Sequence, residues 1–276
     1  MGTLHTYRAA GASAAQGQTT EPSVPLVLLH GFPLDHRMWD DVVPHLPGRH
    51  AVLAVDLPGS APAGTADLSE PSIEAAADAV AAVLAGAGVT EAVVAGLSMG
   101  GYVALALAER RPDLVAGLGL LDTRSTADTT EARENRLRVA AAVESAGTVD
   151  EVRPMAEGLL GETTRVAHPE TAERLARWID EQPPAGVAWS QRAMASRPDR
   201  TEVLGAFDGP VLVLVGDEDV VTPVEAAEHM VAAAGDPRLV VVPHAGHMSA
   251  VEQPAAVAAA LADLVEHVHV TLGPTP

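Results

Sequence analysis

Short apolar runs recur along the chain, each of strand length and each bounded by glycine, proline or charged residues. These runs lack the polar alternation of a strand with one solvent-facing side, so they are typical of strands buried on both faces, as in a parallel sheet. The pattern predicts such strands at residues 24–29, 51–55, 92–95, 115–121, 211–215 and 239–242.

Segments with helical periodicity separate these runs. They lie at residues 37–46, 72–85, 99–110, 224–233 and 254–265. Strands that alternate with helices along a chain predict the α/β class, with a doubly wound and mostly parallel sheet. Residues 1–22 are expected to hold one edge strand, at 4–9, and a flexible loop.

This alternation is interrupted between residues 123 and 209, where no run resembles a strand. A structureless loop of that length would be unusual inside a compact domain. The polar, helical pattern there predicts helices at 130–146, 149–160, 169–181 and 185–196. We therefore expect an α/β core formed by residues 1–122 and 210–276, with residues 123–209 inserted as a helical cap.

Composition narrows the possible partners. The chain has 276 residues, a formal net charge of -20 and no cysteine, so nucleic acid and anionic membranes are unfavourable partners and thiolate metal sites are excluded. Residues 9–23 do not resemble a signal peptide, and no apolar run approaches the length of a membrane span. We expect a cytoplasmic protein, either monomeric or homodimeric.

A serine lies between glycines in the stretch EAVVAGLSMGGYVALALAE, residues 91–109. The Gly-x-Ser-x-Gly pattern alone is weak evidence, but here it joins a buried strand to a helix, as in a nucleophile elbow. Gly96 and Gly100 would leave room for a strained turn, and the N-terminus of the helix favours negative charge. We predict that Ser98 is a nucleophile; the alternative is a tight packing turn.

A serine nucleophile needs a base, and an acid that orients the base. The stretch VLVLVGDEDVVTP offers Asp217 and Asp219, and we prefer Asp219 because Gly-x-x-Asp-x-x-x-Pro spacing places it past the turn. The stretch VVVPHAGHMSAVEQP offers His244 and His247. We prefer His247 as the base because it lies on a short loop at the carboxyl end of the last strand, where open α/β sheets bind ligands.

An oxyanion intermediate also needs hydrogen-bond donors. The stretch LVLLHGFPLD places His30, Gly31 and Phe32 at the end of an apolar strand, where a glycine lets backbone amides approach a ligand. The amides of Phe32 and Met99 are the predicted oxyanion hole. A purely structural turn is the alternative, and His30 is expected to be a buried hydrogen-bonding residue of this turn.

These motifs follow one another in the order typical of the α/β-hydrolase superfamily, which the chain resembles over nearly its whole length after residue 20. Ser98, Asp219 and His247 stand in that superfamily's order, after the His-Gly-Phe loop. GLSMGGYVALALAERRPDLVAGLGLLDT and AGHMSAVEQP are similar to small capped hydrolases that include carboxylesterases and 3-oxoadipate enol-lactonases.

One loop departs from the family pattern. Relatives commonly carry Asp-x-x-Gly-x-Gly-x-Ser after the second central strand, whereas residues 56–63 here read DLPGSAPA and lack the second glycine and the serine. The loop borders the active site in the family, so the expected pocket is less well defined than the triad. Asp122 is expected to be a structural residue at a strand end.

The resemblance implies hydrolysis of a carboxylic ester or lactone through an acyl-enzyme, without a metal or an organic cofactor. Carbon–carbon bond hydrolases, cofactor-free haloperoxidases and perhydrolases share the fold, as does a ligand-binding receptor with residual hydrolysis, and the triad does not separate these alternatives. Trp178 and Trp189 fall in the expected cap. We predict that at least one lines a mainly apolar substrate site; the alternative is that both only join the cap to the sheet.

Overall fold

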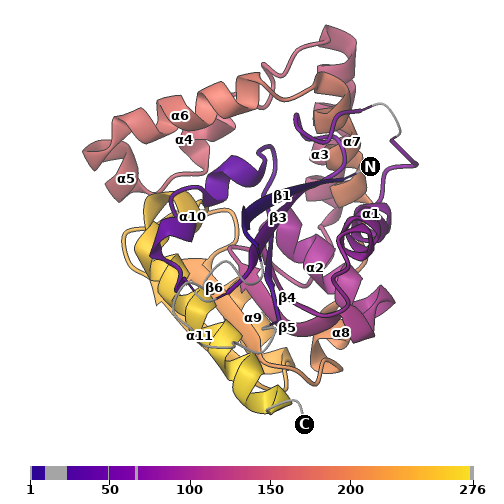
Figure 1. The fold of residues 1–276 in the computed structure, drawn as a ribbon. Helices are drawn as coiled ribbons and strands as arrows, with labels where there is room; N and C mark the ends of the chain where they lie inside the picture. The colour runs from indigo at the N-terminus through magenta and orange to yellow at the C-terminus, as the bar shows by residue number, and fades with distance from the viewer. Residues whose placement is uncertain (1, 10–23, 49, 66–67, 274–276) are drawn as a thin grey trace.

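The computed structural model describes residues 2–9, 24–48, 50–65 and 68–273. Within these ranges, seven strands form one sheet in the order β1-β3-β2-β4-β5-β6-β7 (Figure 1). Neighbouring strands are parallel except β1 and β3, which pair antiparallel at the sheet edge. The predicted α/β class and mostly parallel sheet are confirmed. The flexible loop expected before residue 22 lies, from residue 10 onward, outside the described residues.

The strands lie close to the predicted runs. Their bounds are β1 Thr3–Arg8, β2 Leu26–Leu29, β3 Val52–Asp56, β4 Ala92–Leu97, β5 Val115–Leu121, β6 Val211–Gly216 and β7 Pro237–Val242. The prediction of burial on both faces was wrong for β7, where the side chains of Leu239 and Val241 are 37% and 43% exposed. Alternate residues of a strand share a face, and one face of this edge strand lies open to solvent.

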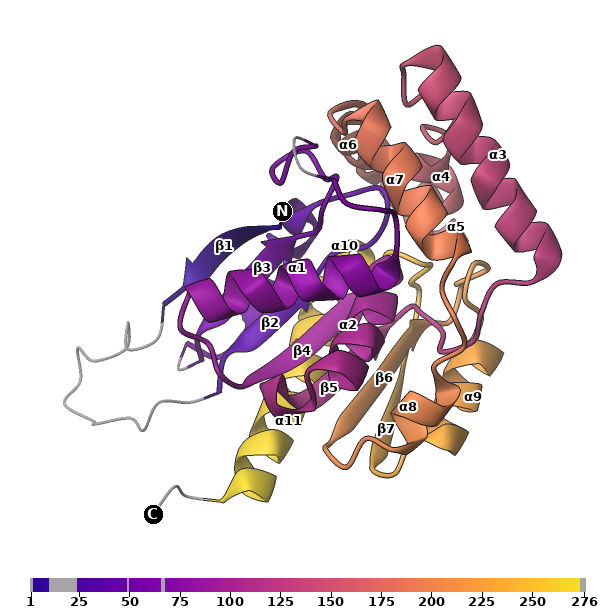
Figure 2. The same cartoon turned by 90° about the vertical axis from the view of Figure 1, so that its right-hand side faces the viewer.

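Helices cover both faces of the sheet, with α1 and α2 on one face and α11 on the other (Figure 2). The core helices are α1 Ile73–Gly86, α2 Met99–Arg110, α9 Val224–Ala233, α10 Ser249–Glu252 and α11 Pro254–Leu272, with short 3-10 helices η2 His36–Trp39, η3 Val43–His45 and η4 Pro112–Leu114. The helix predicted at 37–46 was wrong: η2 and η3 take its place, because Pro44 has no amide proton to continue an α-helix.

The longest of these helices, α11, extends beyond the predicted end at residue 265. By length and composition alone, it is the one helix among the described residues that could cross a membrane. Its apolar side chains, including Val257, Leu261 and Val268, are buried, and the helix packs against β4, β5 and β6. Core helices of globular domains use apolar residues in the same way, so this helix is weak support for a membrane span.

The segment expected to form a cap is helical. Its helices are α3 Thr130–Ala146, α4 Met155–Gly158, α5 Glu162–Ala167, α6 Pro169–Asp180, α7 Pro184–Ala195 and α8 Thr201–Gly205. The helix predicted at 149–160 was wrong in its first half, where the chain turns until Pro154 and α4 then begins. Helices α3 to α7 group together above the sheet in Figure 2, whereas α8 packs against the core helices α2 and α9. The boundary at residue 209 stays a prediction.

Candidate active site

Ser98 occupies a sharp turn between β4 and α2. Its φ of 53° and ψ of -112° lie in a region that side-chain-bearing residues rarely adopt. The Ser98 amide donates to the carbonyl of Leu121 at 2.9 Å, and the Thr123 hydroxyl donates to the Ser98 carbonyl at 2.7 Å. A Cβ atom on Gly96 would collide with the carbonyl oxygen of Gly100. The turn therefore needs glycine at position 96, and hydrogen bonds hold both sides of the serine.

The side chains of Ser98, His247 and Asp219 form a continuous hydrogen-bonded series. His247 Nε2 lies 2.8 Å from Ser98 Oγ, and His247 Nδ1 lies 2.8 Å from Asp219 Oδ2. His247 and Asp219 are only 3% and 5% exposed. With its proton on Nδ1, His247 donates to the carboxylate and presents Nε2 as an acceptor to the serine hydroxyl. The three residues come from distant loops and meet at the carboxyl ends of the strands.

Asp219 accepts hydrogen bonds on both carboxylate oxygens. Its Oδ1 accepts from the amides of Val221 and Thr222 at 2.8 and 2.9 Å, and its Oδ2 accepts from the Thr222 hydroxyl at 2.6 Å. Burial by itself raises the pKa of Asp219, but His247 and Thr222 outweigh it and the pKa lies below its ordinary value. The carboxylate is therefore ionised at neutral pH. Sequence reasoning missed Thr222, although Asp followed three residues later by Thr is a common local hydrogen-bonding pattern.

The two rejected candidates lie apart from this series. Asp217 Oδ1 accepts a hydrogen bond from the backbone amide of His244 at 2.7 Å, so the two rejected candidates are partners of each other. The structure thus places Asp217 and His244 in a contact between the loops after β6 and β7, whereas Asp219 contacts His247 and His247 contacts the serine.

Asp122 directly follows β5 and contacts the end of β6, the strand that leads to Asp219. It is fully buried, and it accepts hydrogen bonds from the Gly216 amide at 3.0 Å and from the Ser249 hydroxyl. Desolvation, followed by the charge of Asp219, raises the pKa of Asp122 well above its ordinary value. The expected structural residue is therefore also an acidic neighbour of the candidate acid, and its hydroxyl partner, Ser249, lies two residues after His247 at the start of α10.

Glu252 hydrogen-bonds to the backbone of the loop that carries His247. Its Oε1 accepts from the amides of Gly246 and Met248 at 3.0 and 3.1 Å, one on each side of His247. Its Oε2 accepts from the amide of Gly161, in the expected cap, at 2.9 Å. One carboxylate therefore positions three backbone amides, and sequence reasoning did not single it out, because nothing local distinguishes Glu252 from other glutamates at helix ends.

The expected cap also touches the base itself. The His247 amide donates to the carbonyl of Leu159 at 2.9 Å. The loop between α4 and α5 therefore lies against the backbone of the candidate base. A shift of the expected cap would change the position of His247.

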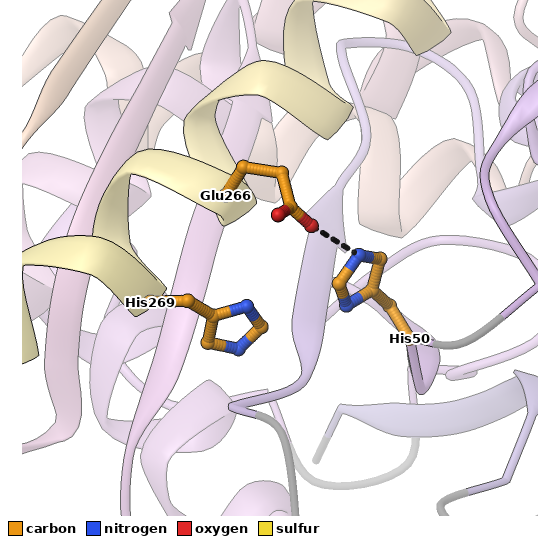
Figure 3. A group of neighbouring side chains, drawn as sticks. All are labelled: His50, Glu266 and His269. Atoms are coloured by element: carbon orange, nitrogen blue, oxygen red, sulfur yellow. Dashed lines mark ion pairs between the residues drawn. The ribbon is translucent and has the colours of Figure 1, made fainter. Parts of the chain in front are cut away.

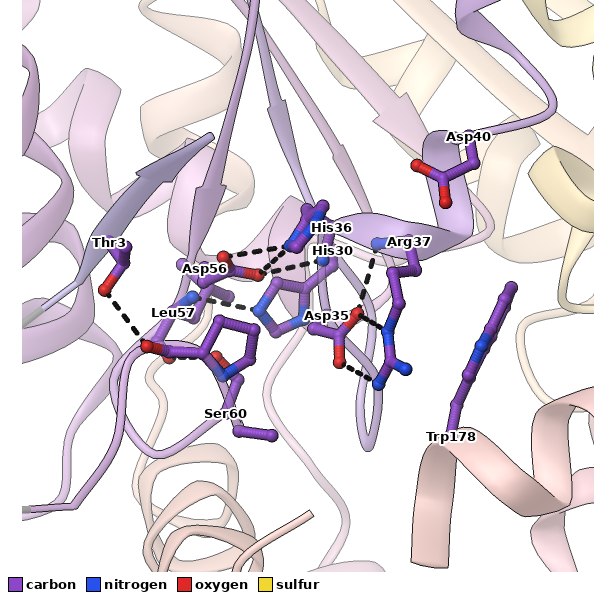
Figure 4. A network of polar contacts seen from close by, with 12 residues as sticks. Thr3, His30, Asp35, His36, Arg37, Asp40, Asp56, Leu57, Ser60 and Trp178 are labelled. Atoms are coloured by element: carbon purple, nitrogen blue, oxygen red, sulfur yellow. Dashed lines mark hydrogen bonds and ion pairs between the residues drawn. The ribbon is translucent and has the colours of Figure 1, made fainter. Parts of the chain in front are cut away.

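The His-Gly-Phe loop lies beside the serine. A Cβ atom on Gly31 would lie 3.6 Å from Ser98 Cβ. His30 is buried, its Nε2 accepts from the Leu57 amide at 2.9 Å, and its Nδ1 lies 3.0 Å from the carbonyl of Gly31 (Figure 4). Burial lowers the pKa of His30, so it is neutral with the proton on Nδ1. The prediction that His30 is a buried hydrogen-bonding residue of this turn is confirmed.

The two predicted oxyanion donors flank Ser98. Met99 is the first residue of α2, so its amide has no acceptor one turn earlier in the helix. Phe32 follows Gly31 in the adjacent loop, and both side chains are buried. The position of these residues is consistent with an oxyanion hole, which stays a prediction.

A second polar network lies next to that loop (Figure 4). His36 Nδ1 lies 3.0 Å from both carboxylate oxygens of Asp56, and this contact raises the pKa of His36. Gln182, at the end of α6, donates to Asp35 at 3.0 Å and accepts from the Ala61 amide at 2.9 Å. Asp35, His36 and Asp56 are close enough to hold a metal ion. Protein groups already hydrogen-bond to Asp35, His36 and Asp56. We therefore interpret the network as a structural link between the expected cap and the core.

The two tryptophans of the expected cap both contact the core. Trp189 is 6% exposed and its Nε1 donates to the carbonyl of Ser69 at 2.7 Å. The ring of Trp178 lies 5.7 Å from the guanidinium of Arg37 and 5.2 Å from that of Arg174. These contacts join α6 and α7 to the core, and a role of either residue in substrate binding stays a prediction.

Comparison with known proteins identifies a matching family, relatives in sequence and similar solved structures. A model of the family described as alpha/beta hydrolase fold matches residues 24–254. Over 248 residues the chain is 34% identical to a pimeloyl-[acyl-carrier protein] methyl ester esterase of Neisseria meningitidis, covering 87% of this chain and 93% of the relative. A solved structure of a thermophilic esterase from Thermogutta terrifontis superimposes with a TM-score of 0.86 and 37% identity, covering 97% of this chain and 94% of that one. The enol-lactonase from Burkholderia xenovorans LB400, at a TM-score of 0.79 and 20% identity, covers 95% and 96% and shares the fold.

Proposed function

The chain belongs to the α/β-hydrolase fold family, and we propose that it is a serine hydrolase that cleaves carboxylic esters or lactones through an acyl-enzyme. Relatives and a structural neighbour that are esterases support carboxylic ester hydrolysis as the reaction. The observation that carries the proposal is the series from Ser98 Oγ through His247 to Asp219, with both hydrogen bonds at 2.8 Å.

In the first half-reaction, His247 Nε2 takes the proton of Ser98 as its oxygen attacks the ester carbonyl. The amides of Phe32 and Met99 stabilise the resulting oxyanion; a comparable donor in other hydrolases lowers the barrier by about 3–4 kcal/mol. The imidazolium then protonates the leaving alcohol, and the acyl group remains on Ser98. Water attacks the acyl-enzyme by the same route and releases the acid.

Asp219 supports this cycle through its charge. Because its pKa is lowered, it is ionised when His247 accepts the proton, and its Oδ2 faces the Nδ1 proton of the imidazolium. The carboxylate holds the ring in the tautomer that leaves Nε2 free for the serine. Thr222 donates to the same oxygen and so keeps the carboxylate oriented.

The proposed substrate is a small, mainly apolar and uncharged ester or lactone. A net charge of -20 disfavours anionic molecules. Several relatives are pimeloyl-[acyl-carrier protein] methyl ester esterases, which favours an ester over the carbon–carbon bond and halogenation alternatives. A cytoplasmic location and a monomeric or homodimeric state stay expectations.

A substrate panel tests this proposal. We would measure kcat/KM for 4-nitrophenyl esters from acetate to dodecanoate, methyl esters of matching acids, lactones and diketones, with Ser98→Ala as the matched inactive enzyme. The expected result is turnover of short and medium esters that falls below about a hundredth in Ser98→Ala, while thermal unfolding is unchanged. Ester turnover that survives in folded Ser98→Ala would refute the serine mechanism. Faster turnover of diketones than of every ester would refute the substrate class.

A further inference from the structure

His50, Glu266 and His269 form a cluster of potential metal ligands (Figure 3). His50 lies just before β3, and Glu266 and His269 lie one turn apart on α11. One potential ligand atom from each residue lies within 4.8 Å of the corresponding atoms of the other two. Residues three apart on a helix share a face, so the position of the two α11 side chains follows from their spacing.

The spacing of the cluster matches that of ligands around one small metal ion. Tetrahedral zinc, with bonds of about 2.0–2.1 Å, places neighbouring ligand atoms roughly 3.3 Å apart and the centres of two imidazole rings roughly 5 Å apart. His50 Nε2 and Glu266 Oε1 are 3.2 Å apart. The ring centres of His50 and His269 are 5.3 Å apart. Small side-chain rotations would therefore complete a three-ligand site.

The environment of the cluster also favours a ligand. His269 Nε2 is buried and has no hydrogen-bond partner among the described residues. An unsatisfied buried nitrogen is costly, and most such groups in folded proteins are paired. Two imidazoles and one carboxylate suit zinc or a similar transition metal, whereas calcium and magnesium prefer oxygen ligands alone.

We propose that His50, Glu266 and His269 bind a Zn²⁺ ion that ties α11 to the segment leading into β3. Water would complete the coordination, as it does in other zinc sites with three protein ligands. This proposal departs from the absence of a metal that the sequence predicted.

The site would be structural, because it lies at the opposite end of the sheet from Ser98. His50 precedes β3, whereas Ser98 follows β4, and β2 pairs parallel with both strands. A metal there would join residues distant in sequence and stabilise the folded chain, since binding to the native state alone raises its stability. Ester turnover should not depend on it.

The test uses untagged full-length protein that has been treated with a chelator and then dialysed. Calorimetric titration with ZnCl₂ should show one strong site per chain, and at about 100-fold excess over Kd the melting temperature should rise by about 5 °C. CaCl₂ should give no shift. Absence of a strong zinc site in the wild-type protein would overturn the proposal.

Two variants on α11 form the matched comparison. His269→Ala should lose at least about 10-fold in zinc affinity, whereas His267→Ala should keep wild-type affinity, because His267 faces Asp236 at 3.3 Å and lies outside the cluster. If His269→Ala does not fold, Glu266→Gln replaces it, since Glu266 is 46% exposed and its amide is the same size.

Equal affinity in the cluster variant and His267→Ala would overturn the proposal. So would a single zinc site that inhibits ester hydrolysis, because that result would place the metal at His247. Binding that is lost with the cluster residue and leaves kcat/KM unchanged would support it.

Discussion

Gly59 and Gly186 bring the core and the expected cap into direct backbone contact. Gly59 lies in the loop after β3 with a φ of 92°, and a Cβ atom built on it would lie 2.9 Å from the Cα of Gly186. A Cβ atom on Gly186 would collide with the carbonyl oxygen of Gly59. The loop that departs from the family pattern is thus the loop against which α7 packs.

Gly186→Ala should therefore destabilise the protein, by about 1–3 kcal/mol, because backbone would have to move to admit a methyl group. The matched control is Gly158→Ala in α4, where an added Cβ meets nothing within 4 Å and alanine favours the helix. Urea unfolding of both variants checks this. Equal stability of Gly186→Ala and wild type would show that the contact is looser than the structure indicates.

Asp219→Asn should reduce kcat by roughly 10³–10⁴-fold, because an amide would stabilise the wrong tautomer of His247. Asp217→Asn, two residues away, should cost far less, since the Asp217 carboxylate accepts from the backbone amide of His244 and has no other side-chain hydrogen bond among the described residues. Steady-state kinetics with one ester measures both. A larger loss in Asp217→Asn would reassign the acid.

Glu252→Gln should reduce kcat by about 10–100-fold with a smaller change in KM, because a glutamine cannot accept from three amides at once. The amides of Gly246 and Met248 flank His247, so the expected effect is on the position of the base. Glu228→Gln, exposed on α9, is the control. If both variants lower kcat equally, or if KM alone changes, Glu252 does not position the base.

The wild-type protein should lose stability as the pH rises, because Asp122 becomes ionised in the unfolded chain, and Asp122→Asn should not show this loss. A raised folded-state pKa means that the wild-type protein loses unfolding free energy as pH rises from about 4 toward that pKa. Asparagine stays neutral, accepts from Gly216 and donates to Ser249, so its stability should fall less over this window. The lowered pKa of Asp219 acts at more acidic pH and does not oppose the trend.

Urea unfolding at about pH 5 and about pH 8 measures the difference. The free energy of unfolding of Asp122→Asn, relative to that of the wild-type protein, should be higher at about pH 8 than at about pH 5. A constant difference at the two pH values would mean that Asp122 is ionised in the folded protein.

The sequence by itself determined the alternation of buried strands and helices, and with it the α/β class. It also located Ser98 at a strand-to-helix turn, because glycine spacing and apolar runs can be recognised completely within a short stretch of sequence. The choice of Asp219 over Asp217 and of His247 over His244 rested on loop spacing, and the geometry of those four residues agrees with it.

Tertiary structure alone decided which distant groups meet. Glu252 reaches the amides around His247, and Asp122 accepts from the Gly216 amide, because β5, β6 and the last loop end at one edge of the sheet. His50 joins α11 only through the packing of that helix on the sheet. Such contacts depend on the path of the chain in space, and no periodicity within a short window encodes them. The short 3-10 turns in place of a helix at 37–46 have the opposite cause, a single proline within the window.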